Sequence, residues 1–590
     1  MVDLRLYRAA LLPFLLVVVV AAFSLGPRPR PLSTTLAPDA FDGPTASGAI
    51  TSLGIQFPDR RPGSPGDAGL ADFMQQAFGR SAGFDVTTHD FTADTVDGRR
   101  TLRDVIATRQ GTSNRSIVIV AHRDAARAGS LAELSGTAAL LELVHVFAGR
   151  ITNRTLTLVS TSGGSGGDAG AAQLARLLPR PVDAVLVLGD LGGTRSRRPY
   201  VVPWSDGTSG SAPIRLRRTV EAALQGELSR SPGGVAITDQ LSRLAFPLTT
   251  GEQGPLLAAG LPAVLIQGSG ELGPHSGDLL SPTRMQALGR GVLRAVNALD
   301  EGADLSTAPT HDLLLGSLVL GAWTVRLLVG ALLLPVLLAG VDIYARLRRR
   351  REAVMPWLGW LLSSAMPFAL AGLFAAALGR TGLLPSAPAG PVTSAQLPID
   401  GNARTAMISV LLVFALGWLG RRALLRAGAA AQRAPGTAGA GPAGAVVLSM
   451  SMLALLVWLR NPFAAALLVL PLHLWLLAML FEPAPPRRIA IGLVVFALVP
   501  LLVVVGLDSA RLELGPLSFC WTALLLVAGG HVGLLAVLAW SIAAGALVAA
   551  LTICAQRPRE RPEQPAVTVR GPMSYAGPGS LGGTDSALRR

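Results

Sequence analysis

A histidine and an aspartate follow the most strand-like run of the chain. The apolar, β-branched residues 117–121 lead into His122, and Asp124 comes two positions later, before a Gly/Ser turn and a helix-like run. At the carboxyl end of a strand in an α/β domain, side chains point into the ligand crevice. A histidine there can bind a metal ion while a nearby acid orients its imidazole. The spacing therefore predicts a metal ligand at His122 and an orienting acid at Asp124.

The elements that would position this pair alternate between strand and helix. Apolar runs bounded by turn residues predict strands, and runs of helical periodicity lie between them. The predicted strands cover 104–108, 117–121, 155–160, 184–188 and 263–267, and the clearest helices cover 138–148 and 285–299. Strands that alternate with helices predict an α/β fold, with a mostly parallel sheet covered by helices on both faces.

Several short segments between about residues 50 and 300 occur in the order found in the M28 family of zinc aminopeptidases, which the chain resembles. They are Arg61-Pro-Gly-Ser64-Pro, Val105-Ile-Ala, His122-Arg-Asp124, the Gly/Ser-rich segment 160–170, Gly189-Asp190, segment 255–264 and Pro274-His275. The resemblance implies an M28-like fold. It also implies a peptidase that uses two zinc ions, held by two His, two Asp and one Glu, with a second Glu as general base.

The resemblance places family metal ligands on three residues of this chain, which are His122, Asp190 and His275. It also assigns Asp124 the role of orienting His122. Catalytic zinc needs about three protein ligands and an open position for water. One of the two zinc sites keeps His122 and Asp190, whereas the other keeps only His275. Zinc remains possible, but this partial ligand set argues against tight binding and is consistent with a vestigial site.

The other family positions have lost their carboxylates. The aspartate that bridges the two metals corresponds to Ala132, and the Glu-Glu pair corresponds to Gly164 and Ser165. Loss of the general base alone would cost about two to four orders of magnitude in rate. Glu133 and Asp168 could replace the missing groups only if the chain shifted locally. We therefore predict a site without its general base, in a protein whose enzymatic activity the sequence leaves uncertain.

Composition points to a membrane protein. The chain has 590 residues, 50% hydrophobic and 15% charged, with a mean hydropathy of +0.47. The formal net charge is +14, which would suit nucleic acid as well as a membrane. Because much of the arginine lies in short clusters beside apolar runs, it fits the positive-inside rule instead. We expect membrane lipid as a partner and no nucleic acid.

Four regions follow from the apolar runs. They are an N-terminal membrane anchor at 1–30, an extracytoplasmic M28-like domain at 31–305, a membrane domain of about seven helices at 306–555, and a disordered basic tail at 556–590. A cleaved signal peptide is the alternative for the first region. Predicted spans cover 313–343, 356–378, 405–421, 444–459, 463–481 and 488–506. Residues 516–553 form either two further spans, or one span and a re-entrant segment.

Arginine clusters follow alternate spans, at 346–351, 421–426, 487–488 and 557–561. Since such clusters mark the cytoplasmic side, we predict a multi-pass plasma-membrane protein with the α/β domain outside. Three functions remain open. The first is a degenerate M28-like protein that binds or scaffolds a peptide or an envelope protein. The second is an active membrane-tethered aminopeptidase with an altered metal site, and the third is a permease-like membrane domain with an accessory ectodomain.

Overall fold

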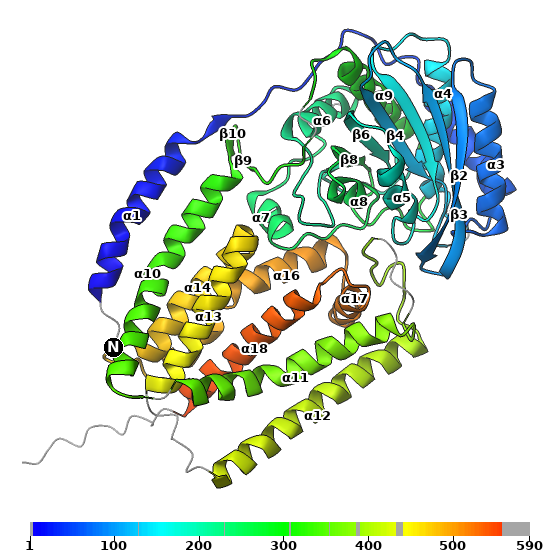
Figure 1. The fold of residues 1–590 in the computed structure, drawn as a ribbon. Helices are drawn as coiled ribbons and strands as arrows, with labels where there is room; N and C mark the ends of the chain where they lie inside the picture. Colours follow the sequence, from blue (N-terminus) through cyan, green and yellow to red (C-terminus); the bar gives the residue numbers. More distant parts are fainter. Residues whose placement is uncertain are drawn as a thin grey trace, which may run out of the picture.

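The computed structural model describes residues 4–556, except for 128, 229, 306–307, 353, 385–389 and 432–439. The predicted tail therefore lies almost entirely outside the described residues. An α/β domain sits at one end of a bundle of long helices, and both parts are seen side-on in Figure 1.

The α/β domain is built on a mixed sheet that has seven strands within the described residues. Its spatial order is β2 (Asp85–Thr95), β3 (Gly98–Arg109), β5 (Thr155–Thr161), β4 (Ser116–His122), β6 (Val182–Leu188), β8 (Ala263–Ile266) and β7 (Val201–Val202). The four inner strands β5, β4, β6 and β8 are parallel, and the pairs at both edges are antiparallel. The predicted parallel sheet is thus confirmed in its centre.

Helices cover both faces of this sheet, as the alternating sequence pattern predicted. They are α2 (Gly43–Gln56), α3 (Pro65–Gly79), α4 (Ser135–Phe147), α5 (Ala169–Leu177), α6 (Ile214–Leu228), α7 (Ile237–Ala245), α8 (Gln253–Ala258) and α9 (Pro282–Glu301). In Figure 1, α3 lies on one side of the sheet, and α5 and α8 lie on the other. Strand β4 is buried over residues 116–121, so its residues form the centre of the domain core.

The rest of the chain is helical. It contains α10 (Ala322–Arg349), α11 (Met355–Arg380), α12 (Gly401–Ala431), α13 (Ala440–Arg460), α14 (Pro462–Leu480), α15 (Arg487–Phe496), α16 (Val499–Arg511), α17 (Pro516–Ala528) and α18 (Leu534–Ala555). Together with the N-terminal helix α1 (Leu4–Phe23), the described residues provide eight helical segments long and apolar enough to cross a membrane. One of these segments is the broken pair α15 and α16, which spans 487–511.

The predicted span at 313–343 begins too early. Residues Leu313–Leu315 and Leu318–Leu320 form a hairpin, β9 and β10, and helix α10 starts only at Ala322. Gly316 turns the hairpin with a φ of +62°, a conformation that glycine adopts without steric cost. Strand β1 (Gly26–Pro27) adds to β10, which ties the exit of α1 to the entry of α10 (Figure 1).

The stretch 516–553 is divided into two helices. Helix α17 has 13 residues and is therefore about 20 Å long at about 1.5 Å per residue, which is too short to cross a hydrocarbon core of about 30 Å. Helix α18 has 22 residues and is long enough. Of the two predicted alternatives, this arrangement matches one span and a shorter segment.

Candidate functional site

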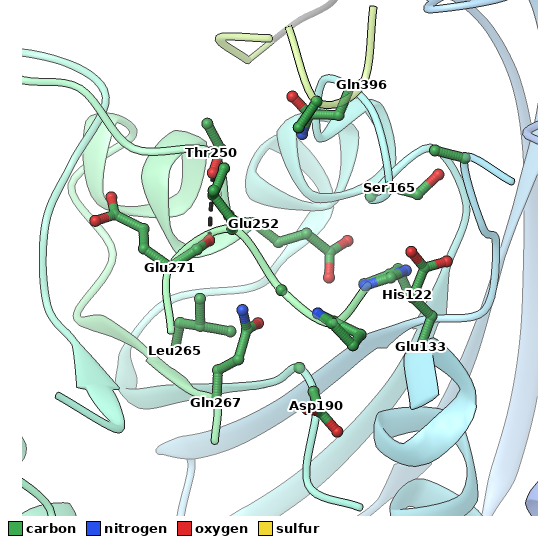
Figure 2. Close-up of a pocket in the computed structure, with 18 of the residues that line it drawn as sticks. His122, Glu133, Ser165, Asp190, Thr250, Glu252, Leu265, Gln267, Glu271 and Gln396 are labelled. Carbon is green, nitrogen blue, oxygen red and sulfur yellow. Dashed lines mark hydrogen bonds between the residues drawn. The ribbon is translucent and has the colours of Figure 1, made fainter. Parts of the chain in front are cut away.

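The carboxyl ends of the parallel strands meet at a cavity of about 230 Å³ (Figure 2). His122 ends strand β4, and Asp190 follows the end of β6, the neighbouring strand in the sheet. Both residues line the cavity, and His275 from the loop before α9 also reaches its wall. The topology therefore brings the three predicted ligands to one pocket, which is the place where α/β folds bind ligands.

His122 is fixed by the backbone that follows it. Its Nδ1 lies 3.0 Å from the carbonyl oxygen of Asp124 and 3.8 Å from the nearer carboxylate oxygen of that residue. The carbonyl therefore accepts the Nδ1 proton, and Nε2 is the nitrogen left for the pocket. Thr137 of α4 donates a hydrogen bond of 2.9 Å to the backbone oxygen of His122. Asp124 orients the ring through its main chain, whereas the sequence suggested the carboxylate.

The carboxylate of Asp124 serves the loop after β5 instead. It accepts backbone hydrogen bonds from Gly164 at 3.0 Å and from Ser165 at 2.9 Å, and a further bond from the Ser165 hydroxyl. These are the two positions at which the family resemblance places a pair of glutamates. The buried acid Asp124 thus holds the loop that would carry the pair, and Gly164 and Ser165 themselves supply no carboxylate.

One carboxylate oxygen of Asp190 and the ring of His275 have partners of their own, whereas Oδ2 of Asp190 has none within the described chain. The Oδ1 atom of Asp190 accepts hydrogen bonds from the backbone of Gly192 at 3.1 Å and of Gly193 at 2.6 Å. Burial raises the pKa of Asp190, although these hydrogen bonds oppose the effect. The His275 side chain is 57% exposed. Its ring contacts the Arg195 guanidinium, and Nε2 lies 3.5 Å from a carboxylate oxygen of Glu513.

Two glutamates occupy the pocket beside His122, and the nearer to the lost pair is Glu252. A Cβ atom added to Gly164 would lie 2.4 Å from His122 Cβ and 3.0 Å from the carboxyl carbon of Glu252. Glu252 therefore takes up the space that a side chain at position 164 would need. It is 2% exposed, accepts a hydrogen bond from Thr161, and has no partner within the described chain for its Oε2 atom. Burial raises its pKa, and His122 opposes that shift.

The second carboxylate belongs to Glu133, in the 3₁₀ turn Ala132–Leu134 that precedes α4. Burial raises the pKa of Glu133 to about 7, while the charge of His122 lowers it. Burial also lowers the pKa of His122, but Asp124, Glu252 and Glu133 outweigh burial and leave that pKa raised. Figure 2 shows the carboxyl groups of Glu133 and Glu252 close to the His122 ring.

Asp168, the other substitute that the sequence offered, does not line this cavity. It is buried at the start of α5 in a left-handed conformation, with φ of +52°. Burial raises its pKa well above the usual range. Of the two substitutes, only Glu133 reaches the pocket.

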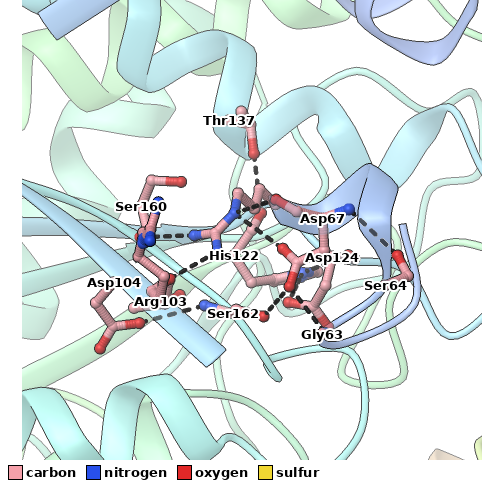
Figure 3. A network of polar contacts seen from close by, with 12 residues as sticks. Gly63, Ser64, Asp67, Arg103, Asp104, His122, Asp124, Thr137, Ser160 and Ser162 are labelled. Carbon is pink, nitrogen blue, oxygen red and sulfur yellow. Dashed lines mark hydrogen bonds and ion pairs between the residues drawn. The ribbon is translucent and has the colours of Figure 1, made fainter. Parts of the chain in front are cut away.

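A buried polar network supports the His122 strand end from below (Figure 3). Arg123 and Asp67 form an ion pair with 2.9 Å between Nε and Oδ1, and both are buried. The Arg123 guanidinium also donates to the backbone oxygens of Ser160 at 3.1 Å and Arg103 at 2.6 Å. One side chain thus ties β4 to β5, β3 and helix α3. Ser64 caps α3 by accepting from the backbone of Asp67, which gives the Arg-Pro-Gly-Ser-Pro segment a structural role.

The helical region completes the cavity wall. Ala395 and Gln396, from the segment between α11 and α12, line the pocket beside His122 and Glu252. This segment is attached to the α/β domain by a 2.6 Å hydrogen bond from the Gly390 backbone to Gly167. It also receives a weaker bond of 3.4 Å from Arg127. No sequence signal marks such a contact, because the partners lie more than two hundred residues apart along the chain.

The residues present do not fit a catalytic zinc ion. Among the described residues, no group of three or more His, Cys, Asp or Glu side chains is arranged to hold a metal. Three protein ligands are the minimum for catalytic zinc. His122 has carboxylates near it and Asp190 keeps one oxygen without a partner in the described chain, but the His275 ring contacts Arg195. The described residues therefore do not assemble the set that the family resemblance implies.

No protein-family model matches this sequence, and no curated protein sequence matches it. Several solved structures are similar to part of the chain. A glutaminyl cyclase of Bacteroides thetaiotaomicron is 15% identical, with a TM-score of 0.34, over 44% of this chain and 98% of that one. The zinc aminopeptidase BSAP of Bacillus subtilis is 11% identical, with a TM-score of 0.36, over 46% and 98%. A leucine aminopeptidase precursor from B. thetaiotaomicron is 14% identical, with a TM-score of 0.35, over 45% and 99%. Identities and TM-scores this low assign no activity and no residue roles.

Proposed function

We propose that this chain is a membrane-bound, M28-peptidase-like protein that binds a peptide or an envelope protein partner and has lost most or all hydrolytic activity. The observation that carries the proposal is the acidic pocket. His122 is flanked there by Glu133 and Glu252, and no complete zinc ligand set accompanies them among the described residues. A buried carboxylate oxygen without a partner is costly, so a ligand that donates hydrogen bonds to Glu252 would stabilise the site.

The chemistry of the pocket defines the ligand group. Glu252 and Glu133 are acceptors, and a cationic donor such as a peptide amine would satisfy both. The carboxylate of Asp124 is occupied by the loop at 164–165 and would only hold that loop in place. Without a general base at the family position, bound peptide would not be hydrolysed at an appreciable rate.

A second candidate function has one observation in its favour. Glu133 and Glu252 both approach His122, and these three residues could form an altered single-metal site. The chain would then be a membrane-tethered aminopeptidase. The donor set argues against it, because the described chain offers no three-residue group with metal-binding geometry.

One experiment separates the two functions. Full-length protein in detergent is measured for bound zinc, for hydrolysis of aminoacyl and peptide substrates, and for binding of peptides with free or acetylated amino termini. We expect no metal-dependent turnover, and binding that acetylation weakens. Glu252→Gln should weaken binding roughly tenfold or more, as loss of a hydrogen bond to a charged group does. The control is Glu142→Gln in α4, whose carboxylate lies outside the pocket and accepts a hydrogen bond from the Asp42 backbone. This substitution should not weaken peptide binding. Turnover that a chelator removes and zinc restores would refute the proposed loss of activity.

We also propose that the α/β domain lies on the extracytoplasmic side of the plasma membrane. The N-terminal end of α1 and the C-terminal end of α10 lie together at the end of the bundle away from the α/β domain (Figure 1). Arg5, Arg8 and the cluster at 346–351 are at that end, where the positive-inside rule favours cytoplasm. Reporters that are active only after export should work when fused near residue 300 and fail near 352. The opposite pattern would overturn this orientation.

A further inference from the structure

A second cavity lies among the long helices, far from the acidic pocket. It measures about 720 Å³ and is bounded mainly by α10, α11 and α13, with Ile542 of α18 also in its lining. Most of its lining is apolar, and several of the large side chains around it are exposed, such as Met355, Leu362 and Leu456. An exposed apolar groove on a membrane-spanning segment faces acyl chains. Its occupant is therefore expected to be a lipid rather than a soluble ligand.

The length of the groove matches one leaflet. Along α13 its lining runs from Ala445 to Leu456, which is about 16 Å at about 1.5 Å per residue. The hydrocarbon core of a bilayer is about 30 Å thick. A groove of this depth therefore accommodates acyl chains from one interface to about the midplane.

One end of the groove is polar. Tyr344, Arg348 and Glu352 line it there, at the C-terminal end of α10. Arg348 is exposed, and its guanidinium makes no hydrogen bond or ion pair with any residue that the structure describes. Trp357 and Trp360 begin the neighbouring helix α11 at the same level, and aromatic residues of this kind mark the membrane interface. The polar end is thus positioned where a lipid headgroup would lie.

Charge selects the class of headgroup. Five arginines occupy positions 346 and 348–351, against the acids Asp342 and Glu352. One of these arginines, Arg346, is paired with Asp342 at 2.8 Å, so the free guanidinium at the groove is that of Arg348. Basic pockets between membrane helices bind anionic lipid headgroups. Glu352 at the same end would accept a hydrogen bond from a headgroup hydroxyl.

We propose that the groove between α10, α11 and α13 is a binding site for one anionic glycerophospholipid. The phosphate contacts Arg348, and the acyl chains lie along Ser449 and Leu456 of α13. The site is separate from the acidic pocket and is independent of the function proposed for that pocket. No covalent step is involved.

Lipid binding is tested on the full-length protein in detergent by native mass spectrometry, with phosphatidylglycerol or phosphatidylcholine added. We expect phosphatidylglycerol to bind several-fold more tightly. Arg348→Gln should lower that preference roughly fivefold, the effect of one interfacial arginine. The matched control Arg380→Gln, at the other end of α11, should keep it. Ser449→Trp, which fills the groove, should reduce binding of both lipids.

Three outcomes would overturn the proposal. They are equal binding of the two lipids by the unmodified protein, an unchanged preference in Arg348→Gln, or equal losses in Arg348→Gln and Arg380→Gln. Because Arg348 is exposed, its substitution does not disturb packing, so this arm remains decisive even if Ser449→Trp does not fold.

Discussion

Asp104 in strand β3 is a buried acid whose protonation should control the stability of the α/β domain. Its side chain is fully buried, Oδ1 accepts a 3.3 Å hydrogen bond from the Ser162 backbone, and Oδ2 has no partner within the described chain. Burial raises the pKa of Asp104 to about 8 from its usual 3.8, although Arg123 opposes the shift. The folded protein therefore keeps the Asp104 proton at neutral pH, whereas the unfolded chain releases it.

The sign of the pH effect follows from this difference. The folded state binds more protons than the unfolded state between about pH 4 and 8. The contribution of Asp104 to stability is thus fully present below about pH 4, and it is lost as pH rises towards 8. At pH 7 the loss is on the order of 4 kcal/mol, from about 1.4 kcal/mol for each pH unit above the unfolded pKa.

Asp104→Asn should remove this penalty, because asparagine is neutral at every pH and resembles the protonated acid in shape. At pH 4 we expect the variant to unfold at nearly the wild-type temperature. As pH rises to 8, its unfolding temperature should exceed that of the wild type by a growing margin. A gain of a few kcal/mol in a domain of this size corresponds to several degrees. The measurement is thermal unfolding of the full-length protein in detergent. At each pH, the difference in unfolding temperature between variant and wild type isolates Asp104, because the other titrating groups are the same in both proteins.

The control is Asp85→Asn, at an exposed position at the start of β2, where the substitution relieves no burial and should leave the unfolding temperature nearly unchanged. If the Asp104→Asn difference is flat across pH, or if the variant is less stable at pH 8, Asp104 is ionised in the folded protein. Its attraction to Arg123 would then outweigh the cost of burying its charge.

Two further predictions concern the packing around Gly164 and the contact between the α/β domain and the helical region. Gly164→Ala should destabilise the protein by about 1–3 kcal/mol, as overpacking does, because its Cβ would lie 2.4 Å from His122 Cβ. Gly48→Ala, in an open position of α2, should stabilise it by about 0.5–1 kcal/mol; equal effects in thermal unfolding would contradict the packing argument. Glu513→Gln should loosen the contact that Arg195 makes with the loop before α17. Since such an ion pair contributes up to about 1 kcal/mol, we expect roughly fivefold faster hydrogen exchange in residues 508–522. Unchanged exchange would show that the ion pair does not hold the two parts together.

The sequence predicted the centre of the fold better than its edges. Strands β4, β5, β6 and β8 are buried apolar runs, and this pattern is visible in the sequence alone. Strand β2, by contrast, is an exposed edge strand rich in polar residues, with little periodicity to detect. The leucines of 313–320 resemble the start of a membrane span because hydropathy alone cannot distinguish a hairpin from a helix.

The site residues likewise differ in whether the sequence could predict their positions. The position of His122 and Asp124 at a strand end could be predicted, because an apolar, β-branched run leads directly into them and ligands bind at strand ends in α/β folds. The approach of Glu252 to His122 could not be predicted, since about 130 residues separate them and only the sheet and the loop before α8 bring them together. The sequence carries no information on where the Glu252 carboxyl group points.

His275 lies where the α/β domain contacts the helical region. The family resemblance makes this histidine a metal ligand, yet here its ring faces Arg195, which also pairs with Glu513 from the loop between α16 and α17. Arg197 pairs with the same carboxylate. Since Gln396 of the helical region also lines the pocket, part of the pocket wall and the partner of Arg195 beside His275 both come from the helical region.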